Sequence, residues 1–465
     1  MIHLHKTYII IASISAGGYL CPRNDALAKL ARDLLKFCAS LISSLKKTIL
    51  SEDFIARHRQ SPDDFTRERI LTFGNLVAFL VNLVKGSLQD ELDHFFQVIR
   101  DRTVPVQEVT KSALCRARKK LRPEAFVELT DKLTAHFYDR MSHKRWRGFR
   151  LLAIDGSTCK VPNTKAVAKH FGVWHAATGD PCPLARVSQL FDVLNHLTVH
   201  ALIRPKEESE RSLAAEHLRY AKAGDLILLD RGYPAFWLFA LIRSAGAHFC
   251  CRMTERTWDI VRDFAASGRA DHIVTLTPGP AALKRCEAMG LPVEPIKLRL
   301  VRVVLDTGEH EILATSLLDQ GRYRADLFGD LYQRRWGVEE SYKVWKQRIQ
   351  VERWTGKSVT AVLQDFHAKV FTANLASVIA RSARDIVAVK TKHRKHVYAV
   401  NFAQALSKMK DVIALLFTRR GVLRIVTELI DVITKTIEPI RPGRKYPRRF
   451  KVGATMLNPT YKPIR

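Results

Sequence analysis

The 465-residue sequence predicts an α/β fold in which a mixed sheet follows an all-helical N-terminal region. Apolar residues recur at helical spacing from residue 24 to 142, and strand patterns are absent there. From residue 150 buried-strand patterns alternate with helical ones, and residues 254–320 become β-rich. These observations predict helices first, then a sheet with helices on its faces and a β-rich insertion.

The composition indicates a folded protein with a polyanionic partner. Lys and Arg number 76 against 46 Asp and Glu, which gives a net charge of +30, and 47% of residues are hydrophobic. Such a hydrophobic content excludes a disordered chain. Because a large positive excess repels itself within the fold, it favours nucleic acid as a partner over a membrane surface or solubility alone.

The cysteines and the first 22 residues indicate where the protein works. The eight cysteines form no C-x-x-C pair, which favours buried thiols in a reducing cytoplasm over zinc or disulfides. Residues 1–22 contain an apolar run that loosely imitates a signal peptide, but the run is too short to span a membrane. We therefore expect a cytoplasmic, nucleoid-associated protein that makes no membrane contact.

Residues 23–145 are expected to form a helical DNA-binding domain. Within it, residues 103–123 fit a short helix, a turn near Thr110 and a basic second helix, which is a helix-turn-helix layout. A solvated charged face is the alternative interpretation. The candidate DNA contacts on or just after the second helix are Arg116, Arg118, Lys119 and Lys120.

The central part, expected to span residues 146–253 and 321–385, contains two strands that each lead to an aspartate. RLLAIDG predicts a buried strand ending in Asp155, and DLILLD predicts another ending in Asp230. The other elements expected before residue 254 are two strands within 186–205, a helix over 210–224, a helix over 234–246 and a strand over 248–253.

The rest of the chain is expected to carry the insertion and further helices. In the insertion, residues 297–319 predict a long hairpin that turns at 306–309. The later elements are expected as helices over 323–350, 358–384 and 400–417, a C-terminal helical region over 386–440, and an extended basic tail over 441–465.

A carboxylate at the C-terminal end of a central strand lies at the rim of the sheet, where α/β folds bind ligands. Asp155 and Asp230 fit this description, although an aspartate there also serves as a turn former or helix cap. The segment around 331–349 adds a third carboxylate. If it is one helix, Tyr332, Arg335, Glu339 and Lys346 share a stripe about 60° wide at the edge of its apolar face, and Glu340 lies well away.

Three carboxylates on separate elements suit a hard cation. Mg²⁺ prefers oxygen ligands, and two such ions can activate an attacking oxygen and stabilise a leaving oxygen in phosphoryl transfer. Tyr332, Arg335 and Lys346 would then contact phosphate. For this segment alone, a surface helix with an i,i+4 pair between Arg335 and Glu339 is the other interpretation.

The pattern Y332-x-x-R335-W-x-V-E339-x6-K346 resembles the Tyr-Arg-Glu-Lys signature of bacterial DDE transposases of the IS-four family. LLAIDGS resembles the family's first-aspartate strand and LLDRGYP its second-aspartate motif, and the gaps between the three carboxylates are 75 and 109 residues. FTRERILTFGNLVAFLVNLVKGSLQDELDHFF also resembles the family's amino-terminal region.

This resemblance implies an RNase H-like core in which residues 254–320 are an insertion domain. It implies that Asp155, Asp230 and Glu339 hold two Mg²⁺ ions, with Mn²⁺ as a possible substitute. Tyr332, Arg335 and Lys346 would contact the DNA backbone, and we add Arg231 beside Asp230. The reaction would be nicking at the inverted-repeat ends followed by 3′-OH attack on target DNA, carried out by a homodimer in a synaptic complex.

Other residues and functions remain open at this point. Trp258 is either a core residue or an aromatic that stacks on a flipped base. His367, Cys159 and Asp192 are expected to be structural. The alternative functions are a catalytically inactive or domesticated sequence-specific DNA-binding protein, and an RNase H-like nuclease without strand transfer.

Overall fold

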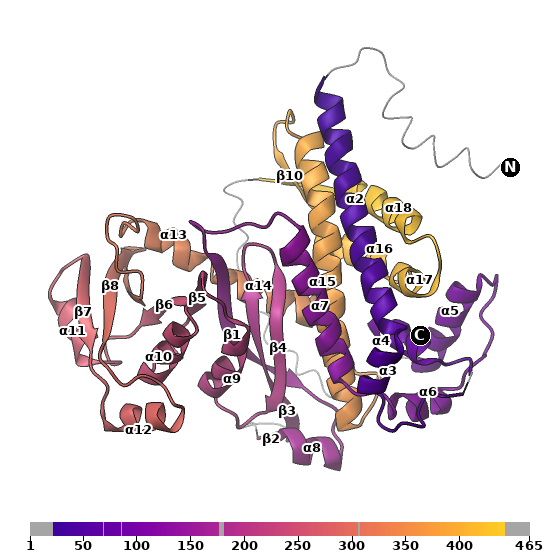
Figure 1. Cartoon of the computed structure of the whole chain (residues 1–465), viewed down its shortest axis with the longest axis horizontal. Helices are drawn as coiled ribbons and strands as arrows, with labels where there is room; N and C mark the ends of the chain where they lie inside the picture. Colours follow the sequence, from indigo (N-terminus) through magenta and orange to yellow (C-terminus); the bar gives the residue numbers. More distant parts are fainter. Residues whose placement is uncertain (1–21, 68, 85, 176–180, 306, 442–465) are drawn as a thin grey trace.

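The computed structural model describes residues 22–67, 69–84, 86–175, 181–305 and 307–441. The expectations for residues 1–21 and 442–465 lie outside this part. As Figure 1 shows, a broad sheet occupies one side of the molecule and a bundle of helices the other. No helix in the described residues is long and apolar enough to cross a membrane.

The N-terminal region is helical, as the apolar spacing predicts. Its longest helices present one apolar stripe to the interior, and several begin at a Ser or Thr whose side chain caps the first turn. The described helices here are α2 (Pro22–Ile49), α3 (Glu52–His58), α4 (Phe73–Val81), α5 (Leu88–Arg100), α6 (Lys111–Arg118) and α7 (Glu124–Arg140).

The helix-turn-helix prediction for residues 103–123 is wrong in its first half. Thr110 does cap a helix, since its hydroxyl accepts the N–H of Ala113 and α6 follows. Residues 101–110, however, form bends and extended chain, so no short helix precedes the turn. The stretch holds Pro105 and three β-branched valines, which disfavour helix.

The central sheet combines antiparallel and parallel strands. In the order β4-β3-β1-β5-β6, β1 pairs antiparallel with β3 and parallel with β5, and β6 continues parallel. This order and these directions form the RNase H-like core that the sequence resemblance implies. The strands are β1 (Arg150–Lys160), β2 (Val173–Trp174), β3 (Cys182–Asp192), β4 (Leu197–Pro205), β5 (Asp225–Leu229) and β6 (His248–Met253).

Helices connect and cover these strands. The expected helix over 210–224 is shorter than predicted, since it ends at His217 and the 3₁₀ turn after it ends at Tyr220, four residues before Gly224. The elements are α8 (Lys165–Phe171), α9 (Glu210–His217), the 3₁₀ turn η1 (Leu218–Tyr220) and α10 (Phe236–Ser244).

The segment after β6 extends the same sheet. β9 pairs antiparallel with β6, β8 with β9 and β7 with β8, and the predicted hairpin joins β8 to β9. Two helices that the β-rich pattern does not predict lie in this segment. The elements are α11 (Asp259–Ala266), β7 (Asp271–Leu276), α12 (Pro280–Ala288), β8 (Ile296–Val304) and β9 (His310–Thr315).

The last third of the described chain is mainly helical. The helix predicted over 400–417 is split in two at Asp411, whose φ of 67° does not fit a helix. The elements are α13 (Leu327–Gln333), α14 (Trp336–Lys343), the π-helical turn η2 (Val344–Ile349), α15 (Val359–Lys390), β10 (Val397–Val400), α16 (Phe402–Met409), α17 (Val412–Thr418), α18 (Val422–Lys435) and β11 (Ile437–Ile440).

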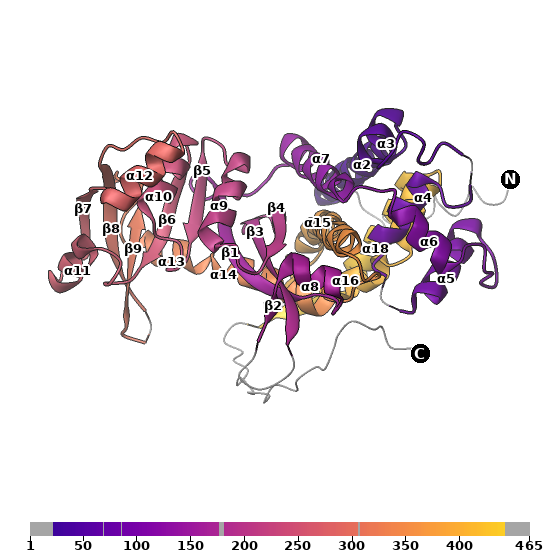
Figure 2. The ribbon, with the colours of Figure 1, turned by 90° about the horizontal axis from the view of Figure 1, so that it is seen from below.

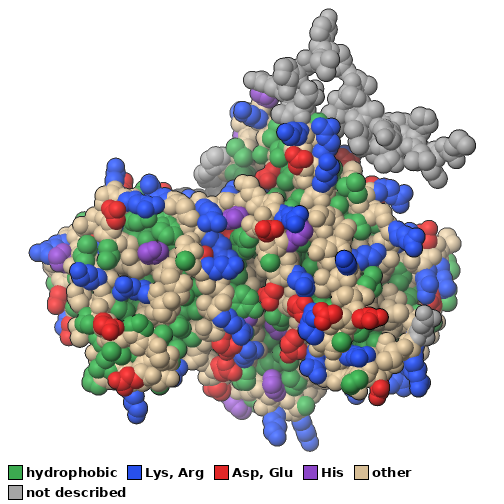
Figure 3. Space-filling model, in the orientation of Figure 1, with side chains coloured by type: hydrophobic (Ala, Val, Ile, Leu, Met, Phe, Trp, Pro, Cys, Tyr) green, Lys and Arg blue, Asp and Glu red, His purple; other side chains and the backbone are tan. Residues whose placement is uncertain are grey.

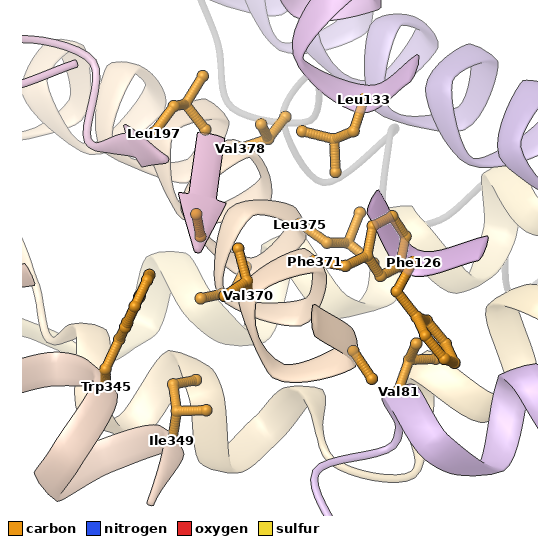
Figure 4. Close-up of a cluster of buried hydrophobic side chains, with 14 of the residues drawn as sticks. Val81, Phe126, Leu133, Leu197, Trp345, Ile349, Val370, Phe371, Leu375 and Val378 are labelled. Carbon is orange, nitrogen blue, oxygen red and sulfur yellow. The ribbon is translucent and has the colours of Figure 1, made fainter. Parts of the chain in front are cut away.

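Helix α15 joins the helical bundle to the sheet. It packs against α2, α7, α18, α4 and β4, and Figure 2 shows it running between the N-terminal helices and the sheet. Figure 4 shows Val370 and Phe371 of α15 between Val81 of α4 and Trp345 of η2. Because this long helix is buried on nearly all sides, the sheet and the N-terminal helices share a continuous apolar core.

Candidate active site

Asp155 and Asp230 lie at the same edge of the sheet. The parallel pairing of β1 with β5 ends at Ala153 and Leu228, and Asp230 directly follows β5. The prediction that Asp155 ends its strand is wrong, because β1 continues to Lys160. Its antiparallel partner β3 extends past the end of β5 and keeps β1 in register. Asp155 therefore lies where β1 extends beyond the end of its parallel neighbour β5.

The helical segment that carries Glu339 is not one helix. It breaks at Arg334 and Arg335 between α13 and α14, and it ends in a π-helical turn. The 100° rotation assumed for residues 331–349 thus does not apply throughout. The break nevertheless leaves Tyr332, Arg335 and Glu339 at the same end of the sheet, as the contacts below show. A π turn is a frequent feature of functional helices.

Three contacts fasten this segment to the aspartate-bearing strands. The Tyr332 hydroxyl donates to the Leu229 carbonyl at 3.3 Å and lies 3.5 Å from Asp230 Oδ1. The Tyr342 hydroxyl donates to the main-chain carbonyl of Asp155 at 2.8 Å. The two tyrosines therefore hold α13 against the end of β5 and α14 against β1 at Asp155.

The three carboxylates influence one another electrostatically. The pKa of Asp155 is raised to about 6, mainly by burial and to a smaller extent by the nearby charges of Glu339 and Asp230, while Arg335 opposes the rise. Opposite and like charges act strongly only at short range in a partly buried site. Asp155, Asp230 and Glu339 therefore share one electrostatic environment.

Arg335 is buried beside these carboxylates. Its side chain donates to Glu339 Oε1 at 2.7 Å, and only 6% of the residue is exposed. The guanidinium lies 5.7 Å from the Tyr332 ring centroid and 5.8 Å from that of Trp336, while its Nε has no partner. In this structure Arg335 is a counter-ion within the carboxylate cluster and faces solvent little.

The other cations of the expected set differ in exposure. Lys346 is exposed in the π-helical turn and donates to the Ser157 hydroxyl at 2.8 Å, two residues beyond Asp155. Arg231 is exposed immediately after Asp230. Lys346 thus contacts a residue near Asp155, Arg231 follows Asp230 in the chain, and both are accessible to a large anionic ligand.

The basic residues of the α6 region divide in the same way. Arg116 and Lys119 are exposed, and Lys120 is partly exposed with its ammonium 2.7 Å from Asp64. Figure 3 shows that basic side chains are spread over the visible face and do not form one patch. Surface cations of this kind can contact phosphates at little desolvation cost.

Arg118 is not a surface residue, and the expectation that it contacts DNA is wrong. Only 4% of it is exposed, and its guanidinium donates to Asp365 Oδ1 at 2.8 Å and to Gln364 Oε1 at 2.9 Å. It also donates to Thr355 Oγ1 at 2.6 Å. These partners on and before α15 use the guanidinium fully, so Arg118 joins α6 to the core.

Two residues near the site have no marked signal in the sequence. Tyr342 holds Asp155 as described. Glu210, the first residue of α9, lies against Gly156, where an added Cβ would meet its Oε1 at 3.0 Å. Arg186 on β3 pairs with the same oxygen at 2.6 Å. Neither residue belongs to a spaced motif, and only the fold brings Glu210 next to the Asp155 strand.

The residues expected to be structural are placed as such. Asp192 is fully buried and accepts the Tyr138 hydroxyl at 2.8 Å. Cys159 is buried, and the cysteines of the described chain are all free. Trp258 packs partly buried against Phe239, with ring centroids 5.8 Å apart. Burial also lowers the pKa of His367 to about 3.

The donor set suits a hard divalent cation. Carboxylate oxygens from three separate elements are what Mg²⁺ accepts. The raised pKa of Asp155 comes first from burial and then from the charges of Glu339 and Asp230, and a bound cation would oppose both effects. In the described residues no group of three His, Cys, Asp or Glu is already close enough to hold an ion. In this structure Glu339 pairs with Arg335 instead.

Known proteins resemble parts of this chain. It is 24% identical over 144 residues to the Putative transposase InsZ of Escherichia coli K12, which covers 30% of this chain and 48% of that protein. Among solved structures, a piggyBac transposase synaptic complex with hairpin DNA covers 87% of each chain at a TM-score of 0.43 and 10% identity.

A second relative and a domain family identify the chain more closely. It is 29% identical over 251 residues to Transposase InsG for insertion sequence element IS4 of E. coli K12, covering 54% of this chain and 56% of that protein. The chain thus spans about half the length of the curated relatives it matches. Residues 146–375 match the Transposase DDE domain family. Residues 146–375 are therefore similar to a transposase DDE domain, and the chain is similar to the IS4-type transposases.

Proposed function

We propose that this protein is the transposase of an insertion sequence, which nicks DNA at the inverted-repeat ends and joins the freed 3′-OH to target DNA by a cut-and-paste route. The observation that carries the proposal is the meeting of three carboxylate-bearing residues at one sheet edge. Tyr332 contacts Asp230, Tyr342 contacts the Asp155 carbonyl, and Glu339 lies in the chain between these two tyrosines. The match of residues 146–375 to the transposase DDE domain supports it.

Asp155, Asp230 and Glu339 would hold the divalent ions that this family implies, and we propose two Mg²⁺ ions that Mn²⁺ can replace. Bound ions of this kind activate an attacking oxygen and stabilise the leaving oxygen of an in-line phosphoryl transfer. Arg335 reduces the repulsion among the carboxylates while it pairs with Glu339. Tyr332 holds the end of β5 and so fixes the chain that leads into Asp230.

DNA is the proposed substrate and partner. The exposed Lys346 and Arg231 would contact the backbone near the scissile phosphate. Tyr332 and Arg335 are each 6% exposed, so they would contact it only at the carboxylates beside which they are buried. Arg116, Lys119 and Lys120 would contact it from the helical region of residues 23–145, which we propose as the DNA-binding domain. A homodimer would bring two inverted-repeat ends together, and the protein would work at the nucleoid in the cytoplasm.

Product analysis tests the proposal. The protein is incubated with Mg²⁺ and linear DNA carrying the inverted-repeat ends that flank its gene, beside an Asp230→Asn control. We expect cut ends and joined strands with the wild type only. Nicks without joined strands would favour an RNase H-like nuclease. Salt-sensitive binding without cleavage by either protein would favour an inactive, sequence-specific DNA-binding protein.

A further inference from the structure

A line of hydrogen bonds runs from the protein surface to the main chain of Asp155. An Arg219 guanidinium nitrogen lies 3.5 Å from His200 Nε2, and His200 Nδ1 lies 2.9 Å from His217 Nδ1. His217 Nε2 lies 2.9 Å from the Ser188 hydroxyl, which donates to the Asp155 carbonyl at 3.2 Å. The line therefore ends on the first carboxylate-bearing residue of the site.

The members of this line are buried in the face of the sheet that α9 covers. Ser188 on β3 and His217 at the end of α9 are fully buried, and His200 on β4 is 4% exposed. His200 stacks on Tyr220 with ring centroids 4.3 Å apart and planes 21° apart. Burial lowers the pKa of His200 to about 2 and that of His217 to about 3, so both rings are neutral at pH 7.

The guanidinium of Arg219 sets the donor-to-acceptor direction of every hydrogen bond in the line. A guanidinium only donates, so His200 Nε2 is the acceptor and His200 Nδ1 carries the proton. His200 then donates to His217 Nδ1, which leaves His217 to donate from Nε2 to Ser188. Ser188 in turn gives its only hydroxyl proton to the Asp155 carbonyl. Each ring is thereby held in a single tautomer.

The Asp155 carbonyl is where two elements of the site meet. It accepts Ser188 from β3 and Tyr342 from α14, three residues after Glu339. Asp155 also lies beyond the last parallel pair between β1 and β5. Side chains therefore hold its peptide group where the parallel ladder no longer does, and the carboxylate extends from the Cα next to that group.

We propose that His217 and His200 are positioning residues that act through Ser188 on the Asp155 carbonyl and so set the direction of the Asp155 carboxylate toward a divalent ion. The inference rests on the proposed function, because it presumes that Asp155 holds a metal. Partners behind a metal ligand typically change metal affinity by about 10-fold to 100-fold when removed. His217 donates to Ser188, which in turn contacts the ligand residue, so we expect the Mg²⁺ affinity to fall about tenfold.

Two variants and a matched control test it on the full chain at pH 7.5. His217→Leu removes the donor to Ser188, and Ser188→Ala removes only the last link and spares the packing of both rings. His367→Leu is the control, since it alters another interior histidine near His200 that lies outside the line. The Mg²⁺ concentration for half-maximal thermal stabilisation is measured without DNA, so that it does not depend on activity.

The expected result is a midpoint about tenfold higher for His217→Leu and Ser188→Ala, with the control unchanged. Equal midpoints for Ser188→Ala and the wild type would overturn the inference while leaving the proposed function intact. A wild type that Mg²⁺ does not stabilise, and that does not cleave DNA, would overturn the proposed function and this inference with it.

Nitrogen NMR of histidine-labelled protein provides a second readout that needs neither metal nor DNA. We expect His217 as the Nε2–H tautomer and His200 as the Nδ1–H tautomer, with the His217 signal shifted in Ser188→Ala. The opposite tautomers, or a protonated ring at pH 7.5, would overturn the proposed direction of the line even if the Mg²⁺ midpoints moved.

Discussion

Replacing Arg118 by methionine is expected to weaken the fold and not the contact with DNA. Arg118 is 4% exposed and its partner Asp365 is 3% exposed, and they pair at 2.8 Å between α6 and α15. Burial alone would raise the pKa of Asp365, but Arg118, Lys369 and the donors of Thr355 hold it below its usual value. The charge of Asp365 therefore depends on its partners.

The structure sets the size of the effect. Removing one partner of a buried ion pair costs about 3–5 kcal/mol, because it leaves a buried charge unpaired. The cost should lie at the lower end, about 3 kcal/mol, because Thr355 still donates to Asp365 and Lys369 still opposes its charge. That loss lowers the folding equilibrium constant roughly a hundredfold.

Urea unfolding followed by tryptophan fluorescence at pH 7 measures this loss, and DNA affinity at fixed salt is measured in parallel. Lys119→Met is the matched control, since the neighbouring side chain is exposed. It should change stability by less than about 0.5 kcal/mol and weaken DNA binding. Adding Asp365→Leu to Arg118→Met should recover part of the stability. If Arg118→Met were as stable as the wild type and bound DNA more weakly, Arg118 would be a DNA contact and not part of the core.

Three further outcomes follow from the same geometry. Asp155→Asn should lower the rate of strand cleavage at least about a thousandfold, because several kcal/mol of transition-state stabilisation by the metal is lost. Its DNA affinity at fixed salt should stay equal or rise, and weaker DNA binding would contradict this. Lys346→Met should reduce the slope of log affinity against log salt by about one, and an unchanged slope would remove Lys346 from the phosphate contacts. Burial lowers the pKa of His367 from 6.5 to about 3, so the unfolded chain binds an extra proton below pH 6.5 and stability falls as the pH drops from there. Between pH 6 and 5, the free energy of unfolding of the wild type should therefore fall more steeply than that of His367→Leu, by about 1.4 kcal/mol per pH unit, as measured by urea unfolding. Equal slopes of this free energy against pH would show that the ring is not buried in its neutral form.

The central strands can be predicted because each one is a short run of apolar residues that is visible in its own sequence. The apolar runs before Asp155 and Asp230 form β1 and β5, and the hairpin between β8 and β9 turns where the glycine at 308 adopts a positive φ. The same reasoning places Asp155 at the end of β1 and misses the longer strand. What extends β1 is its pairing with β3, a contact that its own residues do not encode.

Arg118 shows the limit of reasoning from charge patterns. It belongs to a basic cluster in the sequence, and helical spacing alone does not separate it from the exposed Arg116 and Lys119. Its partner Asp365 is 247 residues away, and only the packing of α6 on α15 brings the two together. A buried cation inside a run of surface cations therefore becomes visible only once the fold is known.

The segment around Glu339 is predicted in part: the sequence selects the correct glutamate but not the shape of the helix. A single helical wheel selects Glu339 over Glu340, and the structure pairs Glu339 with the buried Arg335 while Glu340 pairs with the exposed Lys343. The break at Arg334 and the π-helical turn are not encoded in that wheel. Its choice of side agrees with the structure because Glu339 and Arg335 lie one turn apart within α14 and its cap.

The comparison of Glu339→Gln with Glu340→Gln tests the central claim most directly. The two residues are adjacent on α14, and their side chains are 31% and 63% exposed. Each variant is given Mg²⁺ and DNA with the inverted-repeat ends, and cleaved and joined strands are measured. The account predicts that Glu339→Gln abolishes both products while Glu340→Gln keeps near wild-type levels. Cleavage by Glu339→Gln at the level of Glu340→Gln would contradict a catalytic site built from Asp155, Asp230 and Glu339.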